Sequence, residues 1–196
     1  MRLASTLLAV TLSGLAACTP VVSLTYTPTR AIVPGPPSSV AVVTAEDRLH
    51  RGSHVLLAVP GPYGFRPIAE THRPVADEVA AVFTKALQTR GMIGDAAPHS
   101  ISLTLYDLGG EMTHDSNGID GPLTDMASAS IWIDLAVTDQ SGRTVFKDAV
   151  QDSRLIRTLS SARDDGRLPV LVVALLNATV DRMLDNPAFR TAIQHH

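Results

Sequence analysis

The single cysteine of this 196-residue chain is the side chain best suited to covalent chemistry. Cys18 ends a run without charged residues, Leu3 to Ala17, and Arg2 precedes that run. A short basic segment followed by an apolar one is typical of a secretory signal, and the run is shorter than the ~20 residues of a membrane span. A thiolate is a strong nucleophile, and the small residues before Cys18 let a peptidase approach. The sequence therefore predicts a modified Cys18 and a cleaved signal over residues 1–17.

The residues around this cysteine resemble the lipobox of bacterial lipoprotein signals. Leu15, Ala16 and Ala17 stand directly before Cys18. The resemblance implies a diacylglycerol on the sulfur, cleavage before the cysteine and acylation of the new amine, whereas the alternative is a buried cysteine in an N-terminal helix. Two or three acyl chains, at about 0.8 kcal/mol per buried methylene, form a durable anchor. Lipoproteins of the inner membrane often have Asp after the cysteine. Thr19 differs, so we expect the outer membrane, facing the periplasm.

Other polar side chains do not form a known catalytic or metal-binding motif. Residues 114–122, HDSNGIDGP, miss the EF-hand pattern, because the fifth and sixth positions counted from Asp115 are isoleucine and aspartate. The seven histidines lack the HExxH spacing, and GxSxG and GxxxxGK are absent. Four carboxylates in or near this loop form a weak candidate pair and are more simply solvated: Asp107, Glu111, Asp115 and Asp120. We therefore expect no enzymatic activity, no metal and no cofactor.

Two aromatic residues stand in a stretch rich in proline and glycine. Residues 60–67, PGPYGFRP, are predicted to be irregular because Pro and Gly interrupt them so densely. Tyr63 and Phe65 are candidate contacts for a partner, since aromatic side chains are frequent binding anchors. The alternative is that both rings pack back as a lid over the sheet.

Composition limits the remaining function classes. The formal net charge is −3, so no basic excess points to nucleic acid. A lipidated Cys18 leaves no thiol for a disulfide or a cysteine-rich metal site. Residues 18–39, with PGPPSS at 34–39, are predicted to be a lipidated, Pro-rich tether, in which VVSLTY at 21–26 could still pair as an edge strand. Residues 40–196 are long enough for a single domain with its own core.

Hydrophobic periodicity predicts the elements of that domain. Strands are expected at 40–45, 55–59, 100–108, 128–139 and 144–152, with helices at 74–90, from Pro169 to Asn186, and near the C-terminus. Residues 170–176 are apolar nearly all round, which favours deep burial or a contact in a homo-oligomer. The order of elements predicts an α+β fold, an antiparallel sheet of about four strands with two helices packed on one face.

Several stretches resemble the YajG-type lipoproteins of proteobacteria. They are FTKALQTRGM, ISLTLYDLGGEMTH, ASIWIDLAVTDQSGRTVFKDAV and NATVDRMLDNPAFRTAI. The resemblance rests on element order and apolar positions, and it does not extend to residues 50–65. It implies an α+β periplasmic domain on the outer membrane without established enzymatic activity.

Two functions follow as expectations. The first is a non-enzymatic, lipid-anchored envelope lipoprotein that serves as a binding, adaptor or scaffold module for an envelope protein or the cell wall. The alternative is an auxiliary lipoprotein of a lipid or lipopolysaccharide transport machine. An exposed apolar groove able to hold an acyl chain would favour the alternative. A hydrolase, a third hypothesis, would need polar residues that converge in a pocket.

Overall fold

The computed structural model describes residues 19–49, 52–61, 64–115, 124–159 and 167–194. They form six strands and three helices: β1 (Val40–Asp47), β2 (Val55–Gly61), β3 (Gly64–Glu70), α1 (Val75–Thr89), β4 (His99–Asp115), β5 (Thr124–Asp139), β6 (Thr144–Leu159), α2 (Arg167–Leu184) and α3 (Pro187–Ala192). Each predicted helix is present, and each predicted strand lies within an observed one. Cys18 and its neighbours Leu15, Ala16 and Ala17 lie outside the described residues.

Four strands make one sheet in the order β1-β4-β5-β6. Strands β4, β5 and β6 are antiparallel, whereas β1 pairs with β4 in parallel. The α+β class is therefore confirmed, but the sheet is mixed rather than wholly antiparallel. The reason is the connection: α1 lies between β1 and β4 in the sequence, and such a crossover returns the chain in the same direction.

The central strands are longer than their periodicity predicts. Strand β4 has 17 residues, and β5 and β6 have 16 each. A bulge between Leu105 and Asp107 and two following glycines hide the alternation of β4 in the sequence. At Gly110 a Cβ atom would lie 2.6 Å from Cδ1 of Leu168, so the glycine allows α2 to begin close to the strand.

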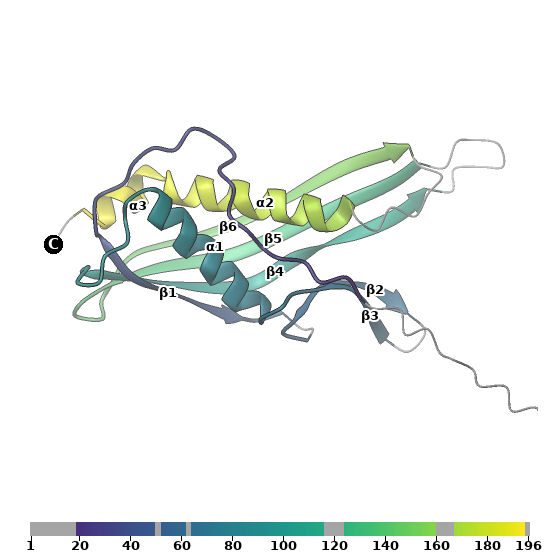
Figure 1. Ribbon diagram of the computed structural model, residues 1–196, viewed down its shortest axis with the longest axis horizontal. Coiled ribbons are helices and arrows are strands. Elements are labelled where there is room, and N and C mark those ends of the chain that lie inside the picture. Colours follow the sequence, from purple (N-terminus) through teal and green to yellow (C-terminus); the bar gives the residue numbers. More distant parts are fainter. Residues whose placement is uncertain (1–18, 50–51, 62–63, 116–123, 160–166, 195–196) are drawn as a thin grey trace, which may run out of the picture.

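Helices α1 and α2 lie side by side on one face of the sheet (Figure 1). Helix α1 covers β1, and α2 covers β4, β5 and β6. The core lies between the two layers and includes the largest fully buried side chains: Phe83, Phe189, Leu56, Leu57, Leu87, Met92, Ile101, Leu103, Leu105, Leu108, Ile131 and Ile133. Burial alternates along β5, as expected for a sheet with one covered face.

The short helix α3 closes one end of the core. Asn186 caps it, and its side-chain oxygen accepts a hydrogen bond from the Ala188 backbone at 2.9 Å. Pro187 occupies the first turn, where a missing N–H costs little. Phe189 is fully buried, and its ring meets that of Phe146 edge-on at 5.8 Å.

The interpretation of residues 60–67 as irregular is wrong for most of that stretch. Strands β2 and β3 form an antiparallel hairpin that pairs Pro60 with Phe65 and Gly61 with Gly64. Apart from the bridge of Val21 to Glu70, no further strand pairs with the edges of this ribbon among the described residues, so a residue without an N–H is tolerated there. Tyr63 and the side chain of Phe65 lie outside the described residues, so neither the partner contact nor the lid is tested.

Residues 19–39, called the N-terminal strap below, lie on the domain. The strap is extended, as its composition predicts, but it packs against the domain instead of running clear of it (Figure 1). Leu24 is buried in the core, and the Val22 backbone donates to the Glu70 carbonyl at 2.7 Å. The Gly35 backbone donates to the Arg90 carbonyl at 3.1 Å. Burial of Leu24 and partial burial of Val22 and Tyr26 favour this packing, together with the backbone hydrogen bonds.

Candidate functional site

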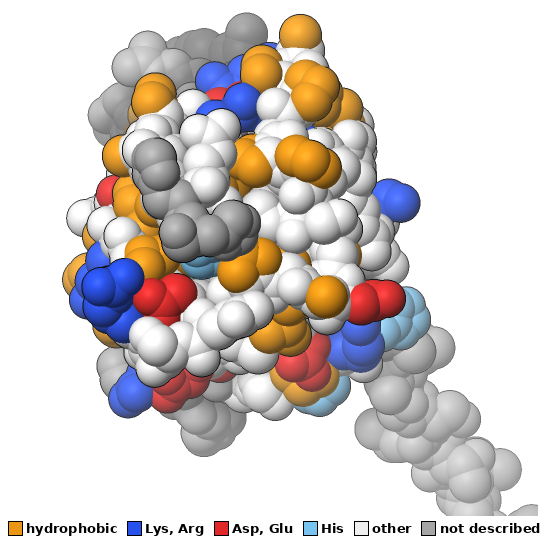
Figure 2. All heavy atoms as spheres, turned by 90° about the vertical axis from the view of Figure 1, so that its left-hand side faces the viewer, with side chains coloured by type: hydrophobic (Ala, Val, Ile, Leu, Met, Phe, Trp, Pro, Cys, Tyr) orange, Lys and Arg blue, Asp and Glu red, His pale blue; other side chains and the backbone are white. Residues whose placement is uncertain are grey.

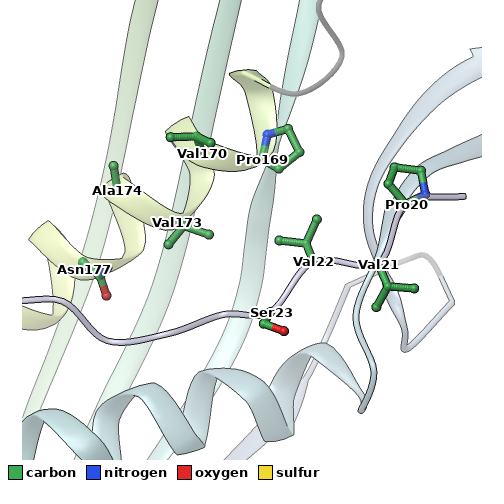
Figure 3. A pocket seen from close by; sticks show the side chains of 9 residues that line it. All are labelled: Pro20, Val21, Val22, Ser23, Pro169, Val170, Val173, Ala174 and Asn177. Carbon is green, nitrogen blue, oxygen red and sulfur yellow. The ribbon is translucent and has the colours of Figure 1, made fainter.

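A groove lies between the start of the strap and the first half of α2 (Figure 3). Its volume is about 670 Å³, within the range of small-molecule sites. Nine residues line it: Pro20, Val21, Val22, Ser23, Pro169, Val170, Val173, Ala174 and Asn177. The strap forms one wall and one face of the helix forms the other.

The groove explains why α2 is apolar nearly all round. On the inner face, Val172, Leu175 and Leu176 are fully buried against the sheet. On the outer face, Val170 lines the groove and 69% of it is exposed, and Val21 across the groove is 51% exposed. Deep burial is thus confirmed for one face, while the other face forms an apolar surface open to solvent.

One polar group in the groove lacks a partner. Asn177 is 4% exposed, and its Nδ2 donates to the Thr25 carbonyl at 3.2 Å. Its Oδ1 has no hydrogen-bond partner within the described part of the chain. Buried amide oxygens are usually satisfied, so an unpaired one in a groove calls for an explanation. Asn177 lies eight residues beyond Pro169, which places it about 12 Å along the helix.

A polar network fixes the strap beyond the groove. Asp181 of α2 accepts hydrogen bonds from the Tyr26 hydroxyl at 2.6 Å and from the Thr29 backbone at 2.7 Å. Arg90 donates to the same carboxylate at 2.7 Å and to the Tyr26 hydroxyl at 2.7 Å. This network sets the course of the strap, and hence the position of the wall that Pro20 to Ser23 form.

Burial and hydrogen bonding oppose each other at Asp181. Burial alone raises its pKa, but the hydrogen bonds from Thr29, Tyr26 and Arg90 outweigh burial and hold the pKa below its ordinary value. Burial raises the pKa of Tyr26, and so does its hydrogen bond to Asp181, while Arg90 opposes the change. The ionised carboxylate and the neutral phenol are therefore the forms that the fold favours.

A second surface feature lies on the face of the sheet that the helices leave open. The centroids of the Tyr106 and Trp132 rings are 4.9 Å apart, and each residue is 41% exposed.

The carboxylates proposed from the sequence are not paired across the sheet. Asp107 and Glu111 of β4 lie opposite Trp132 and Ser128 of β5, so neither acidic residue has a carboxylate directly opposite it on β5. The side chain of Asp115 and all of Asp120 lie outside the described residues.

Neither a metal cluster nor a membrane span is found in the described ranges. No group of three or more His, Cys, Asp or Glu side chains there is arranged to hold a metal. None of the described helices combines the length and apolar character needed to cross a bilayer.

At the end of the molecule away from the groove, charged side chains of both signs lie among hydrophobic ones (Figure 2).

The groove itself could not be named from the sequence, although both of its walls carry a signal. One signal is the apolar run 170–176, in which burial on one side leaves valines on the other. The second is the sequence PVVS at residues 20–23, which is too apolar for a solvated tether. What the sequence could not show is that these two segments meet.

The arrangement of layers defines the protein as an α+β domain with a four-stranded mixed sheet. No family model and no curated protein matches the chain. The resemblance to YajG-type lipoproteins therefore stays a prediction.

The chain is similar to several solved structures. Protein XCC0632 from Xanthomonas campestris, of the family DUF330, superposes with a TM-score of 0.54 at 15% identity, covering 85% of this chain and 95% of that one. The hypothetical protein CT253 from Chlamydia trachomatis gives 0.46 at 10% identity, covering 82% and 100%. A minor lipoprotein from Acinetobacter baumannii gives 0.40 at 8%, covering 76% and 94%. The first of these likenesses establishes the fold and nothing further.

Proposed function

We propose that this chain is a non-enzymatic lipoprotein of the bacterial cell envelope, anchored through lipid on Cys18 to the outer membrane and facing the periplasm. It acts there as a binding or adaptor module for an envelope protein or the cell wall. Tyr63 and Phe65 are the proposed contacts for such a partner. The stretches that resemble YajG-type lipoproteins support the same location.

One observation carries the proposal. The strap contacts the domain from Pro20 onward, two residues after Cys18. Pro20 lines the groove, and its carbonyl accepts a hydrogen bond from the Glu70 backbone at 3.0 Å. A lipid on Cys18 would therefore hold the domain, and the groove with it, close to the bilayer surface. The two polar side chains of the groove, Ser23 and Asn177, include no acid–base pair or nucleophile with its base, which supports a binding role.

Metabolic labelling with a fatty-acid analogue tests the anchor. Wild type should incorporate the label and fractionate with the outer membrane, whereas Cys18→Ser should incorporate none and keep its signal. Thr19→Ser is the matched control, because it alters the neighbouring residue without removing the thiol, and it should be labelled like wild type. Labelling of Cys18→Ser equal to that of wild type would reject the anchor.

A second candidate function is favoured by the lining of the groove. An auxiliary lipoprotein of a lipid or lipopolysaccharide transport machine needs an exposed apolar surface for an acyl chain, and Val21 and Val170 provide one together with the partly buried Val173. In the first candidate the ligand is a protein or the cell wall, and in the second it is a lipid. A transport assay in cells that carry a groove-filling variant, Ala174→Trp, separates them, because only the second predicts a defect.

A further inference from the structure

We propose that the groove between the strap and α2 binds one acyl chain of a membrane lipid, and that this lipid carries an N–H or O–H group which donates to Asn177. The inference rests on the proposed function, because the anchor on Cys18 is what brings the groove to the bilayer. It goes further by naming the site and the chemical class of its ligand.

The lining selects an apolar ligand. Seven of the nine lining residues are Val, Pro or Ala, and no charged side chain is among them. Exposed valines such as Val170 favour the binding of an apolar group, because removing their apolar surface from water lowers the free energy. The helix side of the groove extends about 12 Å from Pro169 to Asn177, a length that suits one chain lying along it.

The position of the groove indicates where the chain comes from. Pro20 to Ser23 form one wall, so the described chain starts beside the groove, directly after the predicted lipid attachment at Cys18. The acyl chains on Cys18 would have to turn back over Thr19 and Pro20 to enter. A lipid of the adjacent bilayer has no such constraint, so we assign the site to a separate lipid molecule.

Asn177 adds a polar requirement. Its Oδ1 is buried without a hydrogen-bond partner in the described residues, while its Nδ2 is already engaged by Thr25. A buried acceptor that stays unpaired is unfavourable, and an incoming donor removes that penalty. A hydroxylated or amide-linked acyl chain supplies both the apolar length and the donor.

Photo-crosslinking in cells tests the proposal with the full chain. The photoreactive residue p-benzoylphenylalanine replaces Val173 in the groove, or Lys147 on the open face of the sheet as a matched control. After illumination, mass spectrometry of the purified protein identifies what is attached. We expect a free membrane lipid with an N–H or O–H group at position 173, at least tenfold more than at position 147.

A variant that fills the groove and a matched control outside it make the test more specific. With the photoreactive residue at position 170, Ala174→Trp should reduce the lipid adduct at least tenfold, whereas Ala149→Trp on the exposed side of β6 should leave it unchanged. Melting temperatures of both variants show that each is folded. Equal adduct yields from both variants would overturn the assignment to the groove.

The other outcomes also count against the inference. An adduct that joins position 173 to the lipid of Cys18 itself would show that the anchor occupies the groove. An adduct with a peptide of another protein would make the groove a protein-docking site, and no enrichment at position 173 would leave it without a lipid. Fatty-acid labelling of Cys18 is scored separately, so a failed anchor is distinguished from an empty groove.

Discussion

Arg90, at the end of α1, donates from Nη2 to Oδ1 of Asp181 in α2 at 2.7 Å, and both side chains are 1% exposed. The same carboxylate accepts hydrogen bonds from Tyr26 and Thr29 of the strap. One buried ion pair therefore joins both helices and the strap, and through the strap it positions a wall of the groove.

Removing one member of this pair should be costly. Asp181→Ala leaves the buried Arg90 with neutral hydrogen-bond acceptors and with Asp185, at 3.6 Å, as its remaining carboxylate contact among the described residues, so we expect a loss of about 3–5 kcal/mol in the free energy of unfolding. The double variant Arg90→Ala/Asp181→Ala removes both charges and should lose less than Arg90→Ala and Asp181→Ala added together. Urea unfolding measures all three variants, and strict additivity would show that the pair is not coupled.

The pH dependence of stability follows from the same groups. The pKa of Asp181 is held below its ordinary 3.8, so its stabilising effect is complete above about pH 4 and is lost as the pH falls through the folded-state pKa. The pKa of Tyr26 is raised above 10.0, so its contribution is complete below pH 10 and is lost as the pH rises further. Melting temperature should therefore fall at both ends of the pH range.

Two substitutions test which group causes each loss of stability. Asp181→Asn should reduce the fall in melting temperature at acid pH (the acid limb), and Tyr26→Phe should reduce the fall at alkaline pH. Each substitution removes the titrating group with little change of shape. If the acid limb of Asp181→Asn is as steep as that of wild type, other carboxyl groups cause the acid loss.

Two residues of α2 give a matched test of its opposite faces. Leu176 is fully buried, so Leu176→Asp should place an unpaired charge in the core and unfold the domain. Val170→Asp introduces the same charge at a position that is 69% exposed, and it should leave the melting temperature within a few degrees of wild type. Circular dichroism during heating measures both, and similar melting of the two variants would contradict the assignment of the faces.

The hairpin of β2 and β3 carries the remaining candidate contact. Replacing Tyr63 and Phe65 together by Ala should leave a lipidated, exported protein whose yield of crosslinked protein partner is reduced. If the rings instead pack onto the sheet, the variant should lose several kcal/mol of stability, the usual scale for emptying aromatic core sites. Melting temperature and partner yield, measured on the same preparations, separate the two.

Local patterns were sufficient to predict most elements of the fold. Helix α1 and the alternating part of β5 follow from hydrophobic periodicity alone, and Gly91 and Gly142 adopt the positive φ angles expected of glycines at a helix end and in a tight turn. The parallel pairing of β1 was missed because strand direction depends on the crossover, not on the composition of the strand. The pairing of Pro60 with Phe65 was missed because proline and glycine weigh against a strand when its free edges are not known.

The site was harder to predict, because it depends on contacts between distant segments. Arg90 stands at the end of a helix that periodicity predicts, but no local pattern shows that its partner Asp181 lies 91 residues further along the chain. Residues 18–39 were assigned to a tether in which VVSLTY at 21–26 could pair as an edge strand. Val21 does form a bridge to Glu70, but no local pattern shows which strand it meets or that Val170 stays exposed on the facing side of α2. Side-chain chemistry at Cys18 needs no such contact, so a sequence motif alone carries that prediction.

The intact mass of the protein purified from the membrane fraction shows whether Cys18 is an acylated N-terminal residue. We expect a mature chain that begins at Cys18 and carries the added mass of a diacylglycerol and an N-linked acyl chain, and Cys18→Ser should lack both changes. A chain that retains Met1, or one that contains an unmodified Cys18, would contradict the lipoprotein assignment.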